Sequence, residues 1–183
     1  RAQLISSQAH NSLTVDGDGQ HRVYTEPTSP SSNPWHSSPE FDFVEGTFDE
    51  GFGPEKSINV THIRSALFIK SEYFLIIDRL MGDGQHDLRW HFMFHPLSLA
   101  LNSNGNGVRS HDMEGANVAF SWSDQDLSSE IFTGETDYPY RGLMTGDADR
   151  PTCSLFLDLK SCVPLTMAFL IEPLKEEKRP IMT

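Results

Sequence analysis

The chain has 183 residues, a length near that of one domain and long enough to bury a sizeable core. Its formal net charge is −12, and its Lys and Arg residues are scattered along the chain, which argues against binding to nucleic acid. No apolar run approaches the roughly 20 residues that span a bilayer, so no membrane segment is expected.

Short alternating runs predict strands through most of the chain. The first, Asn11–Val15, leads into the turn sequence Asp16-Gly17-Asp18-Gly19. A return strand is expected at Gln20–Tyr24. The Pro- and Ser-rich stretch Thr25–Pro39 shows no periodicity and predicts an irregular loop.

The middle of the chain predicts the centre of a sheet. Ile58–Ile69 and Tyr73–Leu80 are two long strand candidates joined by the turn Lys70-Ser71-Glu72. Within the second, Phe74-Leu75-Ile76-Ile77 is apolar on both faces, as expected of a central strand that is covered on both sides. The other expected strands are Phe41–Phe48, Asp87–His95, Asn117–Trp122, Ser129–Thr133, Thr152–Leu159 and Leu165–Ile171.

Helix is expected to be scarce. Only Asp124–Ser129 and Leu174–Arg179 could form a helical turn or two. Strands at roughly 8–12-residue spacing predict an all-β fold, a two-sheet antiparallel β-sandwich with very little helix, in a single domain over residues 1–183. Cys153 and Cys162 are expected as small core residues, and a bridge between neighbouring strands is the alternative.

The opening segment carries the densest polar signal. A His10-Asn11 pair stands at the mouth of a strand and is followed by Val15-Asp16-Gly17 and Gln20, a pattern that packing does not explain. The segment resembles the His-Asn-(Thr/Ser)-Leu-x-Val-Asp-Gly-x-x-Gln segment of the heparinase II/III-like family, which includes heparin, heparan sulfate and alginate lyases.

Later segments fit the same family pattern in the same order. The pattern departs at Ser12, where the family more often has Thr, and at Ile63, where a basic residue is expected before Arg64. The matching segments are Val44-Glu45-Gly46, Thr61-His62-Ile63-Arg64-Ser65, Tyr73–Leu80, Gly84-x-His86 and Trp90-His91-Phe92.

The resemblance implies a domain of a larger enzyme. Family members join an N-terminal helical toroid to a C-terminal β-sandwich and cleave uronate-containing polysaccharides by β-elimination. The chain would then lack the toroid and the first sandwich strands, hold no catalytic residue, and be inactive by itself. Its implied partners are the toroid of the same protein and, through the full enzyme, an acidic polysaccharide, in a periplasmic or secreted setting.

The resemblance also implies two site residues. His10 is the expected metal ligand, for a zinc ion in the full-length enzyme that the isolated chain would not hold stoichiometrically, and Asn11 is the expected substrate-binding residue. Each has a plainer alternative: His10 as a locally hydrogen-bonded loop histidine, and Asn11 as the cap of a strand or turn. His21 and His36 could approach His10, although their spacing does not require it.

Three further side chains have structural interpretations. Arg64 and Arg79 follow apolar stretches and are expected to pair with carboxylates such as Asp78. His91 lies opposite the Trp90 and Phe92 face and is expected to be a solvated or hydrogen-bonded strand histidine.

The sequence has two alternative functional interpretations. One is a carbohydrate-binding or structural sandwich without lyase activity. The other is a self-contained enzyme, which is disfavoured because the sequence has no Gly-x-Ser-x-Gly elbow, no His-Glu-x-x-His and no phosphate loop.

Overall fold

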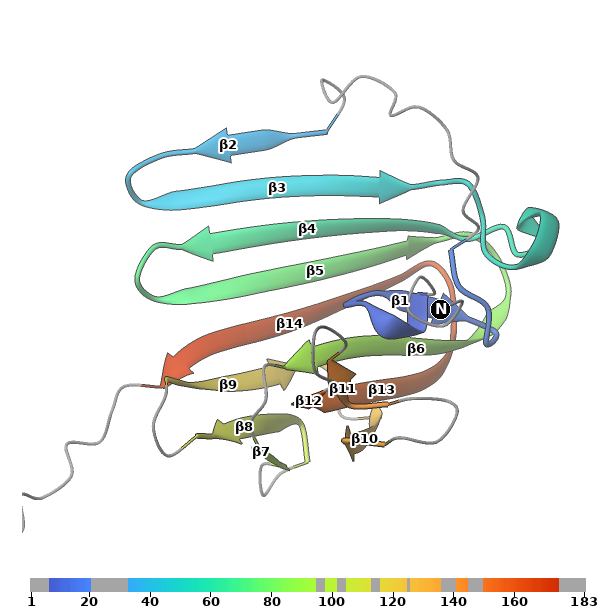
Figure 1. Cartoon of the computed structure of the whole chain (residues 1–183). Helices are drawn as coiled ribbons and strands as arrows, with labels where there is room; N and C mark the ends of the chain where they lie inside the picture. Colours follow the sequence, from blue (N-terminus) through green and yellow to red (C-terminus); the bar gives the residue numbers. More distant parts are fainter. Residues whose placement is uncertain are drawn as a thin grey trace, which may run out of the picture.

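The computed structural model describes residues 7–20, 33–94, 98–101, 105–112, 116–124, 126–135, 141–144 and 150–174. In this part of the chain the regular structure is almost entirely β-strand (Figure 1). The strands are β1 (Leu13–Val15), β2 (Trp35–Ser37), β3 (Phe41–Phe48), β4 (Thr61–Ile69), β5 (Tyr73–Met81), β6 (Gln85–Phe94), β7 (Ser98–Leu101), β8 (Gly107–His111), β9 (Asn117–Trp122), β10 (Ser128–Thr133), β11 (Leu143–Met144), β12 (Arg150–Pro151), β13 (Cys153–Cys162) and β14 (Leu165–Leu174). Two short 3-10 helices, η2 (Ser7–Ala9) and η4 (Pro54–Lys56), complete it.

The strands form two antiparallel sheets that pack face to face, as predicted. The large sheet has eight strands in the order β2-β3-β4-β5-β14-β9-β8-β7, and the small sheet has four in the order β1-β6-β13-β10. A separate two-stranded sheet pairs β11 with β12. The protein is therefore an all-β sandwich.

The core lies between the sheets and is rich in aromatic rings. Trp90 and Phe92 of β6 point from the small sheet toward Phe169 of β14, with ring centroids 5.9 Å and 5.0 Å from it. Phe92 also contacts Phe120 of β9 at 4.6 Å. All four rings are buried, and such contacts add to the free energy gained from their burial.

A tight hairpin between β4 and β5 sets the register that the site depends on. Ser71 adopts a left-handed conformation with φ of 66°, and the Glu72 amide donates a hydrogen bond to the Ile69 carbonyl at 3.0 Å. This turn places Arg64 directly opposite Asp78. Cross-strand partners in an antiparallel pair point to the same face, so both side chains point toward the small sheet.

The structure corrects several expectations. The stretch predicted as a loop, Thr25–Pro39, contains the short edge strand β2, which is paired with β3. Strands β7 and β8 were also not expected, because each is short and adjoins a Gly- and Asn-rich turn that masks its alternation.

Other expectations fall partly outside the described residues. Of the predicted return strand, only Gln20 is described, and it forms a single bridge with Phe52. The described residues between 124 and 129 form a turn and the start of β10 in place of a helical turn. Of Leu174–Arg179, only Leu174 is described, and it ends β14.

The two cysteines occupy opposite ends of β13. Cys153 is buried, as predicted, but Cys162 is exposed, and no disulfide joins them. The bridge between neighbouring strands is therefore excluded.

Among the described residues, no helix has the length and apolar character needed to cross a bilayer.

Candidate functional site

A two-residue turn fixes the opening motif at the edge of the small sheet. Asp16 and Gly17 have φ values of 53° and 83°, and Val15 and Asp18 exchange backbone hydrogen bonds, both of 2.9 Å. Glycine adopts this left-handed conformation without strain, and Asp is one of the residues that can adopt it at the first position of such a turn. The turn holds β1 against β6, and with it the His10-Asn11 pair that precedes β1.

Asp16 joins this turn to the start of β6. Its Oδ1 accepts a hydrogen bond from the Asp87 amide at 2.9 Å, and its Oδ2 lies 2.7 Å from Nδ1 of His86. Partial burial opposes the charged carboxylate, but the hydrogen bonds from His86 and Asp87 outweigh it and lower the pKa of Asp16. The same contact with Asp16 raises the pKa of His86.

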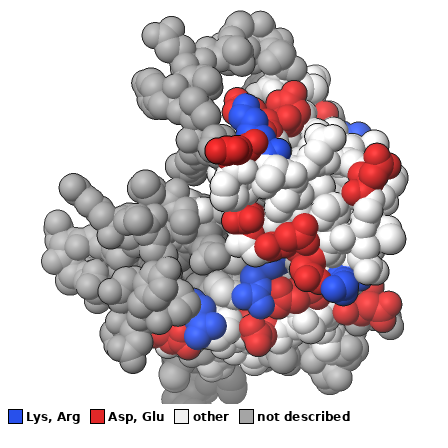
Figure 2. All heavy atoms as spheres, turned by 90° about the vertical axis from the view of Figure 1, so that its right-hand side faces the viewer, with Lys and Arg blue, Asp and Glu red and all other residues white. Residues whose placement is uncertain are grey.

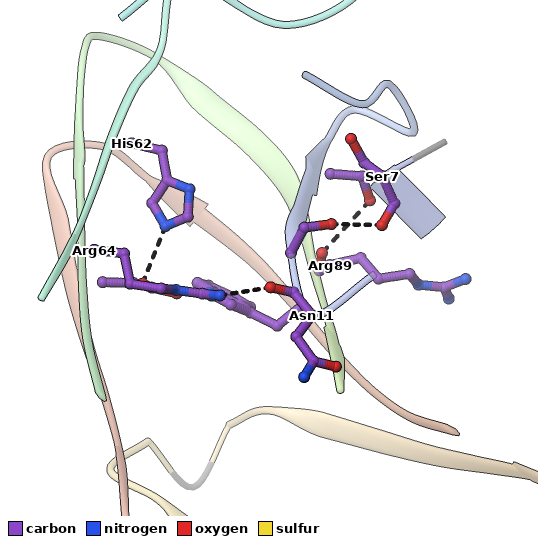
Figure 3. A network of polar contacts seen from close by, with 9 residues as sticks. Ser7, Asn11, His62, Arg64 and Arg89 are labelled. Atoms are coloured by element: carbon purple, nitrogen blue, oxygen red, sulfur yellow. Dashed lines mark hydrogen bonds and ion pairs between the residues drawn. The ribbon is translucent and has the colours of Figure 1, made fainter. Parts of the chain in front are cut away.

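Asn11 links the segment before β1 to β6 and to β4 through hydrogen bonds. Its side-chain Oδ1 accepts a hydrogen bond from the Met93 amide at 2.7 Å, and its backbone carbonyl accepts one from Nη1 of Arg64, also at 2.7 Å. Figure 3 shows the Arg64 side chain on β4 pointing toward the backbone carbonyl of Asn11, whose own side chain points away from it. The contacts match the strand-capping alternative, and substrate binding by Asn11 stays a prediction.

Two other motif residues anchor the buried Ser7. The Ser12 hydroxyl donates to the Ser7 carbonyl at 2.5 Å, and the Gln20 amide donates to the Ser7 hydroxyl at 3.0 Å. Ser12 and Gln20 therefore hold the segment before β1 in place.

A buried carboxylate, Asp78, forms the centre of the site. Arg64 donates to it twice, from Nε to Oδ1 at 2.7 Å and from Nη2 to Oδ2 at 2.6 Å. Trp90 Nε1 donates to Oδ2 at 2.9 Å. His62 Nε2 lies 3.0 Å from Oδ1, close enough for an ion pair but not aligned as a hydrogen bond.

These contacts decide the charge of Asp78, whose side chain is 0% exposed. Burial alone would raise its pKa, but the hydrogen bonds from Arg64, the close approach of His62 and the positive charge of Arg64 lower the pKa to about 2. The carboxylate therefore stays ionised at every ordinary pH. A buried ion of this kind is tolerated because it is fully paired.

A third polar cluster lies on the other face of the large sheet. Glu45 Oε2 accepts hydrogen bonds from the Ser65 hydroxyl at 2.6 Å and from Nη2 of Arg79 at 2.5 Å. The predicted pairing of Arg64 with Asp78 is confirmed, whereas Arg79 points to the opposite face and pairs with Glu45.

A small cleft opens beside Asn11 and Arg64. Its volume is about 270 Å³, just below the roughly 300–1,000 Å³ of typical ligand pockets, so by itself it is a shallow site. Its lining combines segments of β3, β4 and the opening motif, namely Asn11, Ser12, Gln20, Asn33, Gly46, Thr47, Phe48, His62 and Arg64.

His10 is exposed at the end of η2, next to this cleft in sequence. No group of three or more His, Cys, Asp or Glu side chains gathers in the described ranges in a way that could hold a metal. His21 lies outside these ranges, and His36 stacks on Phe41 at 5.0 Å. The described residues therefore do not supply the three or four ligands that zinc needs, and a zinc role for His10 stays a prediction.

His91 is not solvated, although it points away from the core between the sheets. It is 1% exposed, packs edge-on against Phe156 at 4.6 Å, and places Nε2 3.2 Å from the Thr14 hydroxyl. Its Nδ1 is buried without a hydrogen-bond partner. Burial and the nearby charge of Arg89 lower the pKa of His91 to about 4, so the ring is neutral at pH 7.

The basic side chains are occupied by acidic neighbours. Among the described Lys and Arg side chains, every one except Arg109 lies in an ion pair; the pairs are Lys56–Glu50, Arg64–Asp78, Lys70–Asp42, Arg79–Glu45, Arg89–Asp158, Arg141–Glu135 and Lys160–Asp87. Figure 2 shows one face on which blue and red side chains lie next to each other. A larger cleft of about 510 Å³ on the small sheet includes Arg89 and Lys160, both already paired.

Sequence reasoning missed His62 and Trp90 as partners of Asp78. Alternation alone could have placed His62 and Arg64 on one face of β4, but the approach of Trp90 depends on how the two sheets stack. The matching segments of the family pattern therefore meet in three polar clusters, around Asp16, Asp78 and Glu45.

Comparison of the sequence with known families gives a match over residues 1–154 to the family described as "Heparinase II/III-like, C-terminal". No curated protein sequence matches the chain.

Several solved structures share the fold. The heparan sulfate lyase HepC from Pedobacter heparinus is 22% identical with a TM-score of 0.71, covering 98% of this chain and 26% of its own. A heparinase III described as the BT4657 gene product is 18% identical with a TM-score of 0.70, covering 96% of this chain and 25% of its own. The chain thus spans about a quarter of the length of these structural relatives. Since the family match extends over most of the chain, the protein belongs to the heparinase II/III-like family, in the region that is C-terminal in that family.

Proposed function

We propose that this chain is the C-terminal β-sandwich domain of a lyase that cleaves uronate-containing polysaccharides by β-elimination, and that the reacting groups come from a further domain. The observation that carries the proposal is the family match over residues 1–154. Structural relatives named as a heparan sulfate lyase and a heparinase III support it, and the matched region is about a quarter of their length.

The described residues favour a supporting role in this chemistry. β-Elimination removes the proton at C5 of the uronate, forms the C4–C5 double bond and releases the C4 oxygen, which takes up a proton. It needs a base, an acid and a group that neutralises the uronate carboxylate in one cleft. Asp78, with a pKa of about 2 and no exposed surface, is a poor base. His91 is equally buried.

The charges of the described residues also favour a supporting role. Neutralising a uronate carboxylate requires a cation that is not already paired. The guanidinium of Arg64 lines the small cleft, but it donates to Asp78 and to the Asn11 carbonyl. With a chain charge of −12, the chain as a whole repels an anionic polysaccharide, so positive charge from another domain favours its binding.

The exposed His10 and the cleft beside Asn11 are the part of this chain that faces the substrate or the catalytic domain. His10 is free to approach a bound sugar chain because it is exposed. Loops at the end of a rigid sandwich are common sites of such contacts. A zinc ion at His10 requires ligands from outside the described residues.

The test uses the protein with all that its gene encodes around this chain. It is incubated with heparin, heparan sulfate and alginate, and with a neutral glucan as the control. The proposal predicts growth of the unsaturated-uronate absorbance on at least one acidic polymer and none on the glucan. Absence of unsaturated product on every uronate-containing polymer would overturn it.

A further inference from the structure

The centre of the large sheet is apolar on both faces. Its inner face packs on the small sheet, and Ile76 of β5 and Phe169 of β14 are paired in register on that side. Successive side chains of a strand point to opposite faces, so Leu75 and Ile77, which flank Ile76, point to the outer face. A strand that is apolar on both faces is typical of a sheet covered on both sides.

The outer face carries a row of four apolar side chains. They are paired in register across β3, β4, β5 and β14, and they are Phe43, Leu67, Leu75 and Leu170. Each is partly exposed, and none belongs to the core between the sheets or packs against it. These four residues are here called the outer row.

Further apolar side chains border the outer row along both of its sides. On one side, Phe41, Ile69 and Tyr73 are partners across β3, β4 and β5. On the other side, Ile77 is the partner of Ala168. All five are partly exposed, so the outer row is the centre of a wider apolar surface.

The size of this surface is that of a protein interface. Among the described elements, the small sheet is the one layer that packs on the large sheet, and it lies on the inner side. Five neighbouring strands, β3, β4, β5, β14 and β9, span about 24 Å, and the length of β4 is about 30 Å, which gives roughly 700 Å². A specific interface buries about 800 Å² of each partner, and exposed apolar patches of several hundred Å² often mark such interfaces.

The surface is also matched to itself. A two-fold axis that runs parallel to the strands between Leu67 and Leu75 sets Phe43 over Leu170 of the second copy. An axis that runs along the outer row sets each of its residues over the same residue of the second copy. Both arrangements bring apolar side chains together, as an interface between identical subunits requires.

The charges of this face permit such a contact although the chain carries a net charge of −12. The outer row is uncharged, and beside it Arg79 pairs with Glu45 at 2.5 Å, so these two charges cancel. A pair that is already formed costs less to bury than a single charge. Sugar recognition, by contrast, requires several polar groups directed at hydroxyls, which the outer row does not have.

We propose that the outer row is the centre of a two-fold interface at which two copies of this protein pack sheet against sheet. The spacing is that of two stacked sheets, about 10 Å. Arg64 points to the inner side, so the interface leaves the small cleft beside Arg64 and Asn11 open. The dimer goes beyond the proposed lyase function and does not depend on it.

Sedimentation of the protein with all that its gene encodes, over a wide range of concentrations, measures the association. The parent should have the mass of a dimer. Leu75→Asp places two carboxylates in each interface and should raise the dissociation constant by at least about 100-fold. Its melting temperature in the monomeric state should stay close to that of the parent, because Leu75 lies outside the core.

Cys162→Asp is the matched control. It adds the same charge at an exposed position of the small sheet, on the other side of the sandwich, and it removes an exposed thiol. This variant should remain a dimer. Loss of the dimer in Cys162→Asp, with a dimer retained in Leu75→Asp, would show that a disulfide or the small sheet joins the copies.

Hydroxyl-radical labelling of the parent, read by mass spectrometry, tests the same surface without a substitution. Labelling of Leu75 and Leu170 should fall at concentrations where the dimer forms, and that of the exposed Trp35 should not. A protein that is monomeric at every concentration overturns the proposal. If its outer row is nevertheless protected from labelling, another domain of the same chain covers it. The lyase assay is scored separately, so a monomer that cleaves polysaccharide refutes the dimer alone, and an inactive dimer refutes the proposed function alone.

Discussion

Arg64 holds the buried carboxylate of Asp78 with two parallel hydrogen bonds, from Nε at 2.7 Å and from Nη2 at 2.6 Å. The third guanidinium nitrogen donates to the backbone carbonyl of Asn11. One side chain thus links the centre of the large sheet to the segment that precedes β1. Of the described arginines, Arg64 is the one that connects the buried cluster to the candidate site.

The first prediction concerns this ion pair. Asp78→Asn should lower the free energy of unfolding by about 3–5 kcal/mol, because it leaves Arg64 and His62 beside a neutral group in a buried setting. Urea unfolding at pH 7 measures the change. The control, Asp42→Asn at an exposed pair, should leave the unfolding midpoint nearly unchanged. Equal effects of the two variants would contradict the buried cluster.

The pH dependence of stability provides a second test of the buried Asp78 carboxylate. Its folded pKa of about 2 lies below the ordinary value of 3.8, so its contribution to stability is present above pH 3.8 and is lost as pH falls toward 2. The shift corresponds to about 2 kcal/mol. Unfolding free energies of the protein and of Asp78→Asn, measured from pH 5 to pH 2, should converge toward the acid end, and parallel curves would contradict the assignment.

The ion pair between His86 and Asp16 should stabilise the protein in a different pH range. The pKa of His86 is raised above 6.5, so its contribution is present below pH 6.5 and is lost as pH rises through the folded value. The pKa of Asp16 is lowered below 3.8, so the contribution of Asp16 to stability is lost as pH falls through its pKa in the folded protein. His86→Gln should therefore lower the melting temperature most between about pH 4 and pH 6.5. His10→Gln, at an exposed histidine, is the control, and a pH-independent effect of His86→Gln would contradict the ion pair.

His91, unlike His86, should make the protein less stable as the pH falls. Its folded pKa of about 4 lies below 6.5, so protonation favours the unfolded chain and stability falls as pH drops from 6.5 to 4, by about 3 kcal/mol. His91→Gln retains a group that can hydrogen-bond the Thr14 hydroxyl and should remove this acid sensitivity. Urea unfolding at pH 7 and pH 4.5 compares the two proteins; an equal loss in both would show that His91 is not the cause.

The sequence predicted the fold well where apolar runs are bounded by polar residues. The bounds of β3 and β9 match expectation, because polar residues flank both runs, Glu40 and Asp49 around β3 and Ser123 after β9. β2 was missed since Pro34 and Pro39 surround only three strand residues, and such a strand becomes recognisable only from its partner.

The site was less predictable than the fold. The Arg64–Asp78 pair follows from the hairpin that joins β4 to β5, so sequence reasoning found it. The Asn11–Arg64 and Trp90–Asp78 contacts cross between the sheets, and neither periodicity nor spacing determines which strands stack. His10, exposed and without a described ligand partner, keeps its role as a prediction.

That role has its own test in the longer protein. His10→Ala should leave the melting temperature of the isolated chain unchanged because the side chain is exposed. In the longer protein it should lower turnover on the preferred polysaccharide by about 10-fold, the scale seen when a metal shell is disturbed. Turnover equal to that of the parent, with equal metal content, would leave His10 as an ordinary loop histidine.

The central claim is that this chain supports a lyase without supplying its reacting groups. A side-by-side assay of the pure 183-residue chain and the longer protein, at equal molar concentration on heparan sulfate, tests it most directly. The account predicts unsaturated uronate from the longer protein and none from the chain alone, whose buried Asp78 and paired Arg64 cannot carry out elimination. Unsaturated product released by the pure chain at a rate proportional to its concentration would contradict it.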